Sequence, residues 1–149
     1  RSLVFLEQES TEEQLKQSNL SNFYVIEFAT HAVEVRINDT VQGPALVLAE
    51  VDRQSPQRDG LLTSREIEKL SLDSPLIILS ACDTAATSDV GRQPYSGLAS
   101  AFLFAGAESV IATHWPVESV SSARIVTGMF RHLRRGEERS IADSLRLYL

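Results

Sequence analysis

The sequence contains little sulfur and no long apolar run. It has one cysteine, one methionine and one tryptophan in 149 residues. The single cysteine, Cys82, leaves no disulfide framework within the chain and is typical of a reducing compartment, so we expect a cytoplasmic location. Apolar runs stay well below the ~18 residues of a membrane span and no signal peptide is visible, so we expect no membrane contact.

Positive charge is also scarce. The chain carries 14 Lys and Arg residues against 20 Asp and Glu, a net charge of −6, which argues against nucleic acid or an anionic membrane surface as the main partner. The one basic cluster, at residues 131–135, is followed by Glu137 and Glu138 and is typical of a solvated helix end. The remaining composition, 43% hydrophobic and 23% charged, is that of one globular domain with its own core.

Motifs for nucleotides and metals are missing. The sequence has neither GxGxxG nor a P-loop, so nucleotide binding has no support. No CxxC, HExxH or carboxylate–histidine cluster has the spacing of metal ligands. We expect neither a metal nor a cofactor.

The apolar pattern predicts strands that alternate with helices. Ser10 or Thr11 is expected to cap the first helix and Thr63 or Ser64 the second, with Glu66 as a capping-box partner three residues after Thr63. An Asp59-Gly60 turn predicts a hairpin outside the main sheet. Strands are expected at residues 3–6, 23–30, 45–49, 61–62, 76–81 and 110–113, and helices at 12–18, 63–70, 95–105, 119–135 and from 140 onward. This order predicts an α/β fold with a mainly parallel sheet.

Two of these strands lead into reactive side chains. The run at residues 24–30 ends at His31, and the run at 76–81 ends at Cys82. Continuous apolar runs are typical of parallel strands that are covered on both faces. Chemistry in such sheets sits beyond the carboxyl ends of the strands. The pattern indicates a base beside a thiol nucleophile.

Each of these residues also has a structural interpretation. A free cysteine such as Cys82 often behaves as a small buried hydrophobe, and a lone histidine such as His31 is often a structural side chain. If they meet, imidazole can take the thiol proton and imidazolium lowers the pKa of Cys82. The backbone N–H of Cys82 and one from the loop after His31 are the candidate oxyanion donors. His114 lies beside Trp115 at another predicted strand end. Its side chain either lines the same cleft as His31 and Cys82 or packs against its neighbours.

These residues lie within four ordered motifs that resemble the CHAT domain family, the caspase-like group of cysteine peptidase domains often found behind TPR repeats. The resemblance spans almost the whole chain. The motifs are Phe28-Ala29-Thr30-His31, Leu79-Ser80-Ala81-Cys82-Asp83-Thr84-Ala85, the segment 97–107, and Trp115-Pro116-Val117.

The resemblance implies a caspase-like three-layer sandwich with His31 and Cys82 as the catalytic dyad. Backbone groups of Ala32 and Cys82 then hold the oxyanion, and Asp83, His114 and Trp115 are candidates for the substrate pocket. Ala32 replaces the glycine that usually follows the histidine. The family's first strand and helix are absent, so we interpret residues 1–149 as the C-terminal piece of a larger protein, with an upstream TPR-type repeat region as a partner.

The sequence therefore predicts a cysteine endopeptidase domain that acts on a protein or peptide. One alternative is a catalytically weak or inactive scaffold or signalling module, which Ala32 and the absent first strand favour. A small-molecule thiol hydrolase on a generic α/β sheet is the other alternative.

Overall fold

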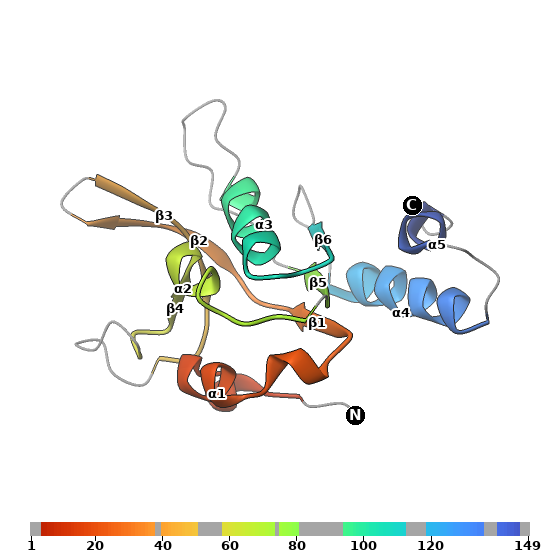
Figure 1. The fold of residues 1–149 in the computed structure, drawn as a ribbon, viewed down its shortest axis with the longest axis horizontal. Coiled ribbons are helices and arrows are strands. Elements are labelled where there is room, and N and C mark those ends of the chain that lie inside the picture. The colour runs from red at the N-terminus through yellow and green to blue at the C-terminus, as the bar shows by residue number, and fades with distance from the viewer. Residues whose placement is uncertain are drawn as a thin grey trace. The chain divides into compact units, whose positions relative to one another are not determined.

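A computed structural model describes residues 4–37, 40–50, 58–73, 75–80, 94–112, 119–135 and 140–146 (Figure 1). The chain forms two compact units, Arg1–Trp115 and Pro116–Leu149. The second unit contains two helices that contact each other, α4 (Ser119–Arg135) and α5 (Ile141–Arg146), and α4 is amphipathic. None of the described helices is long and apolar enough to cross a membrane.

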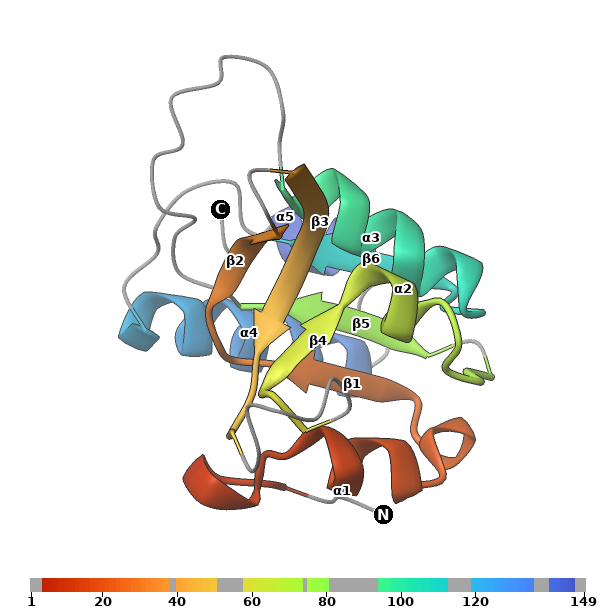
Figure 2. The same ribbon diagram turned by 90° about the vertical axis from the view of Figure 1, so that its left-hand side faces the viewer.

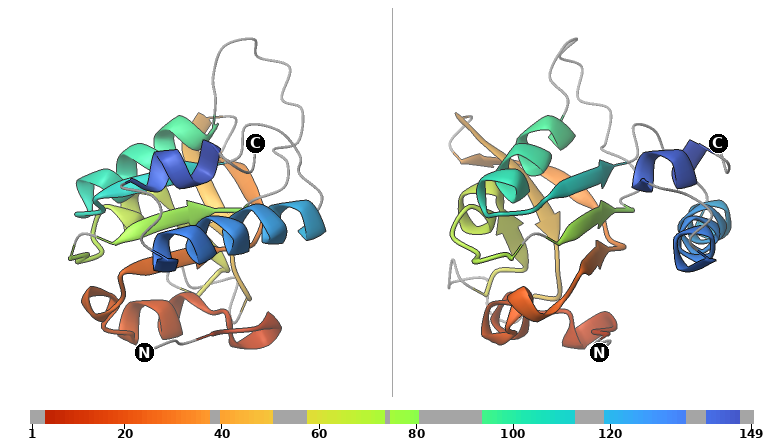
Figure 3. Two further views of the ribbon diagram at one scale, coloured as in Figure 1. Left: turned by 90° about the vertical axis from the view of Figure 1, so that its right-hand side faces the viewer. Right: turned by 45° about the vertical axis from the view of Figure 1, so that its right-hand side comes forward.

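The first unit contains a parallel sheet with strand order β1-β5-β6. These strands are β1 (Val25–Phe28), β5 (Leu76–Leu79) and β6 (Ser109–Ala112). Every residue of β5 is buried, as expected for the middle strand of a covered sheet. Figure 3 shows the three strands side by side, with helix α1 (Glu12–Gln17) on the side of β1 away from β5. The α/β class is confirmed.

A second sheet is antiparallel, with strand order β2-β3-β4 (Figure 2). Its strands are β2 (Ala32–Ile37), β3 (Thr40–Val47) and β4 (Leu61–Thr63). The hairpin expected outside the main sheet is confirmed as the β3–β4 pair, with Asp59 Oδ1 accepting the Leu61 N–H at 2.9 Å and Gly60 at a φ of +80°. Strand β2 was not predicted. The described residues thus form the expected parallel sheet and, beside it, an antiparallel sheet of three strands.

The expected strand at residues 3–6 is wrong for residues 4–6, which the structure describes. Residues 4–6 are irregular, and Val4 and Leu6 are each 67% exposed. A strand needs a neighbour to satisfy its backbone groups, and among the described residues no strand pairs with this run. The apolar character of residues 4–6 is therefore not sufficient to form a strand without a neighbour to pair with.

The core contains residues from one face of the parallel sheet, from all three strands of the antiparallel sheet and from helices α2 (Ser64–Ile67) and α3 (Pro94–Phe104). The rings of Phe28 in β1 and Phe102 in α3 have centroids 5.2 Å apart. Ile77 and Leu79 of β5 point to the same face because they are two residues apart in the strand, and Leu79 shares this face with its paired residue Phe28. Gly106, at a φ of +106°, ends α3, as the sequence predicts.

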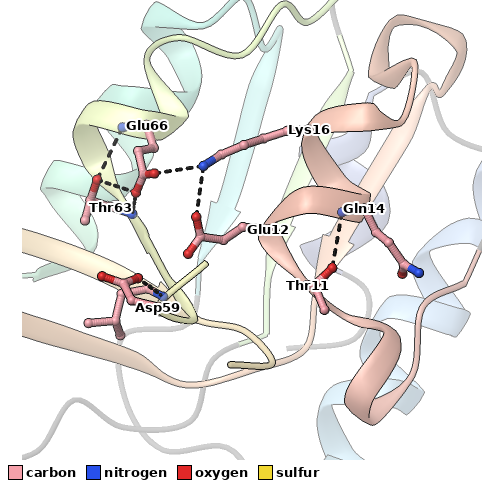
Figure 4. A network of polar contacts seen from close by, with 8 residues as sticks. Thr11, Glu12, Gln14, Lys16, Asp59, Thr63 and Glu66 are labelled. Carbon is pink, nitrogen blue, oxygen red and sulfur yellow. Dashed lines mark hydrogen bonds and ion pairs between the residues drawn. The ribbon is translucent and has the colours of Figure 1, made fainter. Parts of the chain in front are cut away.

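Helix α1 is held to α2 by one lysine between two carboxylates (Figure 4). Lys16 Nζ lies 2.9 Å from Glu12 Oε2 and 2.8 Å from Glu66 Oε1. The other oxygen of Glu66 accepts the Thr63 N–H at 3.0 Å and the Thr63 hydroxyl at 2.8 Å, which confirms the predicted capping box. The contact thus joins the first turn of α1 to the start of α2.

The two carboxylates of this contact differ in environment. The Glu12 side chain is fully buried, and its Oε1 has no partner among the described residues, so burial raises the pKa of Glu12. Burial also acts to raise the pKa of Glu66, but hydrogen bonds from Lys16 and Thr63 outweigh it and lower that pKa. Lys16 is therefore needed chiefly to compensate the buried charge of Glu12.

Lys16→Met is expected to lower the free energy of unfolding by about 1–3 kcal/mol near neutral pH, because it leaves the Glu12 carboxylate buried without its cation. The double variant Lys16→Met/Glu12→Gln should lose less, since no unpaired charge remains. A carboxyl group with a raised folded pKa loses its favourable contribution as pH rises through that pKa, so the loss in Lys16→Met should grow with pH.

Urea denaturation of these variants at mildly acidic and neutral pH measures this effect. Lys69→Met is the matched control, because Lys69 is exposed and forms no ion pair with a described residue. A double variant as unstable as Lys16→Met would contradict the assignment of the loss to an unpaired Glu12.

Candidate functional site

The site forms where β1 and β5 end together. Phe28 and Leu79 are the last paired residues of these two strands, and the Ser80 N–H donates to the Phe28 carbonyl at 3.0 Å. Parallel neighbours lie about 4.8 Å apart, so both chains leave the sheet at the same edge. His31 follows Phe28 by three residues, and Cys82 follows Leu79 by the same number.

Two hydrogen bonds fix the backbone around His31. The Thr30 hydroxyl donates to the carbonyl of Val47, and the Val47 N–H donates to the His31 carbonyl at 2.8 Å. His31 therefore sits at the corner where the chain leaves the parallel sheet and enters the antiparallel one. Its side chain is exposed, which leaves the imidazole accessible at the sheet edge.

Ala32 is the first residue of β2, and its backbone N–H and C=O point away from β3. Residues of an antiparallel pair alternate between hydrogen-bonded and non-hydrogen-bonded positions. Because the His31 carbonyl accepts the Val47 N–H, the next pair, Ala32 with Leu46, is a non-hydrogen-bonded one. The Ala32 N–H thus takes no part in the ladder. The residue is only 1% exposed, however, and its methyl group belongs to the core.

A polar contact at the same edge was not predicted from the sequence. The Ser80 hydroxyl donates to Glu27 Oε1 at 2.9 Å, which links the strand end before Cys82 to β1. Its signal in the sequence is a hydroxyl residue directly after one apolar run and a carboxylate inside the neighbouring run. The contact is exposed and contributes at most about 1 kcal/mol to the free energy of unfolding. Its main effect is to orient the Ser80 and Glu27 side chains.

The remaining predicted site residues lie outside the described residues. These are Cys82, Asp83, His114 and Trp115. The described part of the site therefore consists of His31, Ala32 and the ends of β1 and β5. No group of three His, Cys, Asp or Glu side chains among the described residues is arranged to hold a metal ion.

Comparison with known proteins gives one family. The model of the CHAT domain family matches residues 2–147, nearly the whole chain. No curated protein matches the sequence.

Ala32→Gly is expected to lower the free energy of unfolding by about 1–2 kcal/mol, because it removes a buried methyl group and frees the backbone of the unfolded chain. Ala29→Gly is the matched control: Ala29 is exposed, so only the entropic cost of about 0.5 kcal/mol is expected. Urea denaturation measures both, and equal losses would mean that the Ala32 methyl group is not a core contact.

Proposed function

Because the chain belongs to the CHAT domain family, which is related to caspase-like cysteine peptidases, we propose that it is a cysteine endopeptidase domain with His31 and Cys82 as its dyad. The observation that supports the proposal is the equal offset of these two residues beyond the paired residues Phe28 and Leu79. Adjacent parallel strands that end in register bring a base and a thiol to one edge.

The proposed reaction uses only side-chain and backbone groups. His31 takes the thiol proton, and the Cys82 thiolate attacks the carbonyl carbon of a peptide bond. The resulting tetrahedral oxyanion is held by the N–H groups of Cys82 and Ala32. Imidazolium at His31 then gives its proton to the leaving amine, and water hydrolyses the thioester to release the acid and restore the thiol.

The family also suggests the surroundings of the dyad. We infer a caspase-like three-layer sandwich, with Asp83, His114 and Trp115 in the substrate pocket and a protein or peptide as substrate. An upstream TPR-type repeat region is the proposed partner in the polypeptide.

The low exposure of Ala32 favours a second candidate function. At 1% exposure, its N–H is poorly accessible to a substrate oxyanion, as in a scaffold or signalling domain with weak or no turnover. A thiol-directed acyl probe separates the two candidates. An active peptidase labels at Cys82 and turns over peptides, whereas a scaffold reacts no faster than an ordinary thiol.

Cys82→Ala is expected to reduce cleavage on the order of 10⁴-fold or more, because the nucleophile is lost. The loss of volume is small, so the fold is expected to persist. Cleavage is measured with a peptide library, and circular dichroism serves as the control for folding. Full activity in this variant would exclude the proposed mechanism.

His31→Ala is expected to abolish turnover and to make Cys82 less reactive near neutral pH, because the base beside the thiol is gone. The rate of iodoacetamide alkylation as a function of pH measures this directly. His132→Ala is the matched control, since it removes an imidazole of α4 that is not among the proposed site residues. Identical pH profiles for wild type and His31→Ala would show that His31 does not act on the thiol.

A further inference from the structure

The Thr30 side chain joins the end of β1 to strand β3. Only residues 29–31 separate β1 from β2, so this short segment carries the chain from the parallel sheet into the antiparallel one. The Thr30 hydroxyl donates to the Val47 carbonyl, and the Val47 N–H donates to the His31 carbonyl at 2.8 Å. Two consecutive residues of the segment therefore bind both backbone polar groups of Val47.

The bond to the His31 carbonyl continues the ladder between β2 and β3. Ala32 pairs with Leu46 in this ladder, so the preceding position places His31 opposite Val47. A hydrogen-bonded antiparallel pair exchanges two bonds between main chains. Here the Val47 carbonyl accepts a side-chain hydroxyl from the residue before His31. Thr30 thus ties the segment to β3 just before the regular ladder begins.

Val47 is a fixed anchor because β3 is the central strand of the antiparallel sheet. Val47 pairs with Leu61 of β4. Leu46, directly before it, is fully buried, and the Leu48 N–H, directly after it, donates to the Gly60 carbonyl at 2.7 Å. A group that binds Val47 is therefore held relative to the core.

Helix α3 packs against both ends of the segment that contains Thr30. A Cβ atom added at Gly97 of α3 would lie 2.9 Å from Pro44 Cγ, so the helix and β3 are in close contact. The Phe102 ring of the same helix lies 5.2 Å from that of Phe28, the last residue of β1. Residues 29–31 therefore span two points that one helix fixes relative to each other.

The imidazole of His31 lies outside this packing. Because the His31 side chain is exposed, burial contributes little to its orientation. The direction of its Cα–Cβ bond depends instead on the backbone dihedral angles of residues 30 and 31. The two hydrogen bonds to Val47 restrict these angles.

We propose that Thr30 is a positioning residue for His31, and that its hydroxyl directs the imidazole to the edge where β5 ends. The expected effect on rate rests on the proposed peptidase function, in which His31 is the base. A displacement of about 1 Å in a reacting group can cost on the order of 100-fold in rate. Loss of the hydroxyl should therefore lower kcat. KM should stay unchanged, since Thr30 is not among the proposed substrate contacts.

Thr30→Val and Thr30→Ser test the proposal as a matched pair. Valine keeps the branched shape and removes the hydroxyl, whereas serine keeps the hydroxyl and removes the methyl group. Thr30→Val is expected to lower kcat on the order of 10- to 100-fold, and Thr30→Ser to keep the wild-type kcat within about threefold. Thermal unfolding gives the folded fraction of each protein, so that rates are compared per folded molecule.

The order of the His31 backbone provides a measurement that does not need turnover. The chain has three histidines, so labelling with ¹⁵N-histidine gives three backbone amide signals, and the one missing in His31→Ala belongs to His31. Its NMR order parameter is expected near ~0.85 in wild type and Thr30→Ser, and to fall towards ~0.6 in Thr30→Val.

The proposal is overturned if Thr30→Val keeps the wild-type kcat or the wild-type order parameter. It is also overturned if Thr30→Ser is as impaired as Thr30→Val, because the hydroxyl would then not be the group that matters. If wild type cleaves no peptide and the order parameter still falls in Thr30→Val alone, the peptidase function fails and the role of Thr30 in holding His31 stands.

Discussion

The register between β1 and β5 is the constraint on which the rest of this structure depends. Phe28 is paired with Leu79, and this pairing decides where both strands end. A shift by one residue would turn the side chains of β1 to the opposite face and remove Phe28 from its contact with Phe102. Packing in the core thus fixes the register. The register in turn sets where the two strands end relative to each other, and in the sequence His31 and Cys82 follow these ends by three residues each.

The residues between β1 and β2 fix how the chain passes from the parallel sheet into the antiparallel one. The Thr30 hydroxyl and the His31 carbonyl both bind backbone groups of Val47, so the chain enters β2 at a defined angle. Ala32 then packs its methyl group into the core. An alanine suits this position because the backbone here is that of a strand, in which a glycine would only add conformational freedom. The replacement of the family's glycine is therefore compatible with the local fold.

Much of this could be predicted from the sequence, for reasons that differ between elements. The mainly apolar runs that contain β1, β5 and β6 predict parallel strands, since such strands need apolar side chains on both faces. Thr63 with Glu66 identifies a helix start, because both groups satisfy backbone donors locally. His31 was placed at a sheet edge from the run before it. These features depend on interactions close in sequence.

The missed features depend on partners far along the chain. Strand β2 has a partly polar sequence, and its pairing with β3 decides its conformation. The sequence of residues 3–6 is typical of a strand, but residues 4–6 pair with no strand among the described residues and line a cleft instead. Likewise, nothing in the local sequence indicates that Lys16 would bind Glu66, which lies 50 residues further along the chain. Long-range pairing, and not local propensity, decides these cases.

The two edges of β1 connect the site with the cleft. One edge pairs with β5 up to Phe28 and Leu79, while Val25 and Glu27 line a cleft of about 980 Å³ at the other edge. Glu27 belongs to both regions, because its carboxylate accepts the Ser80 hydroxyl next to the strand end that leads to Cys82.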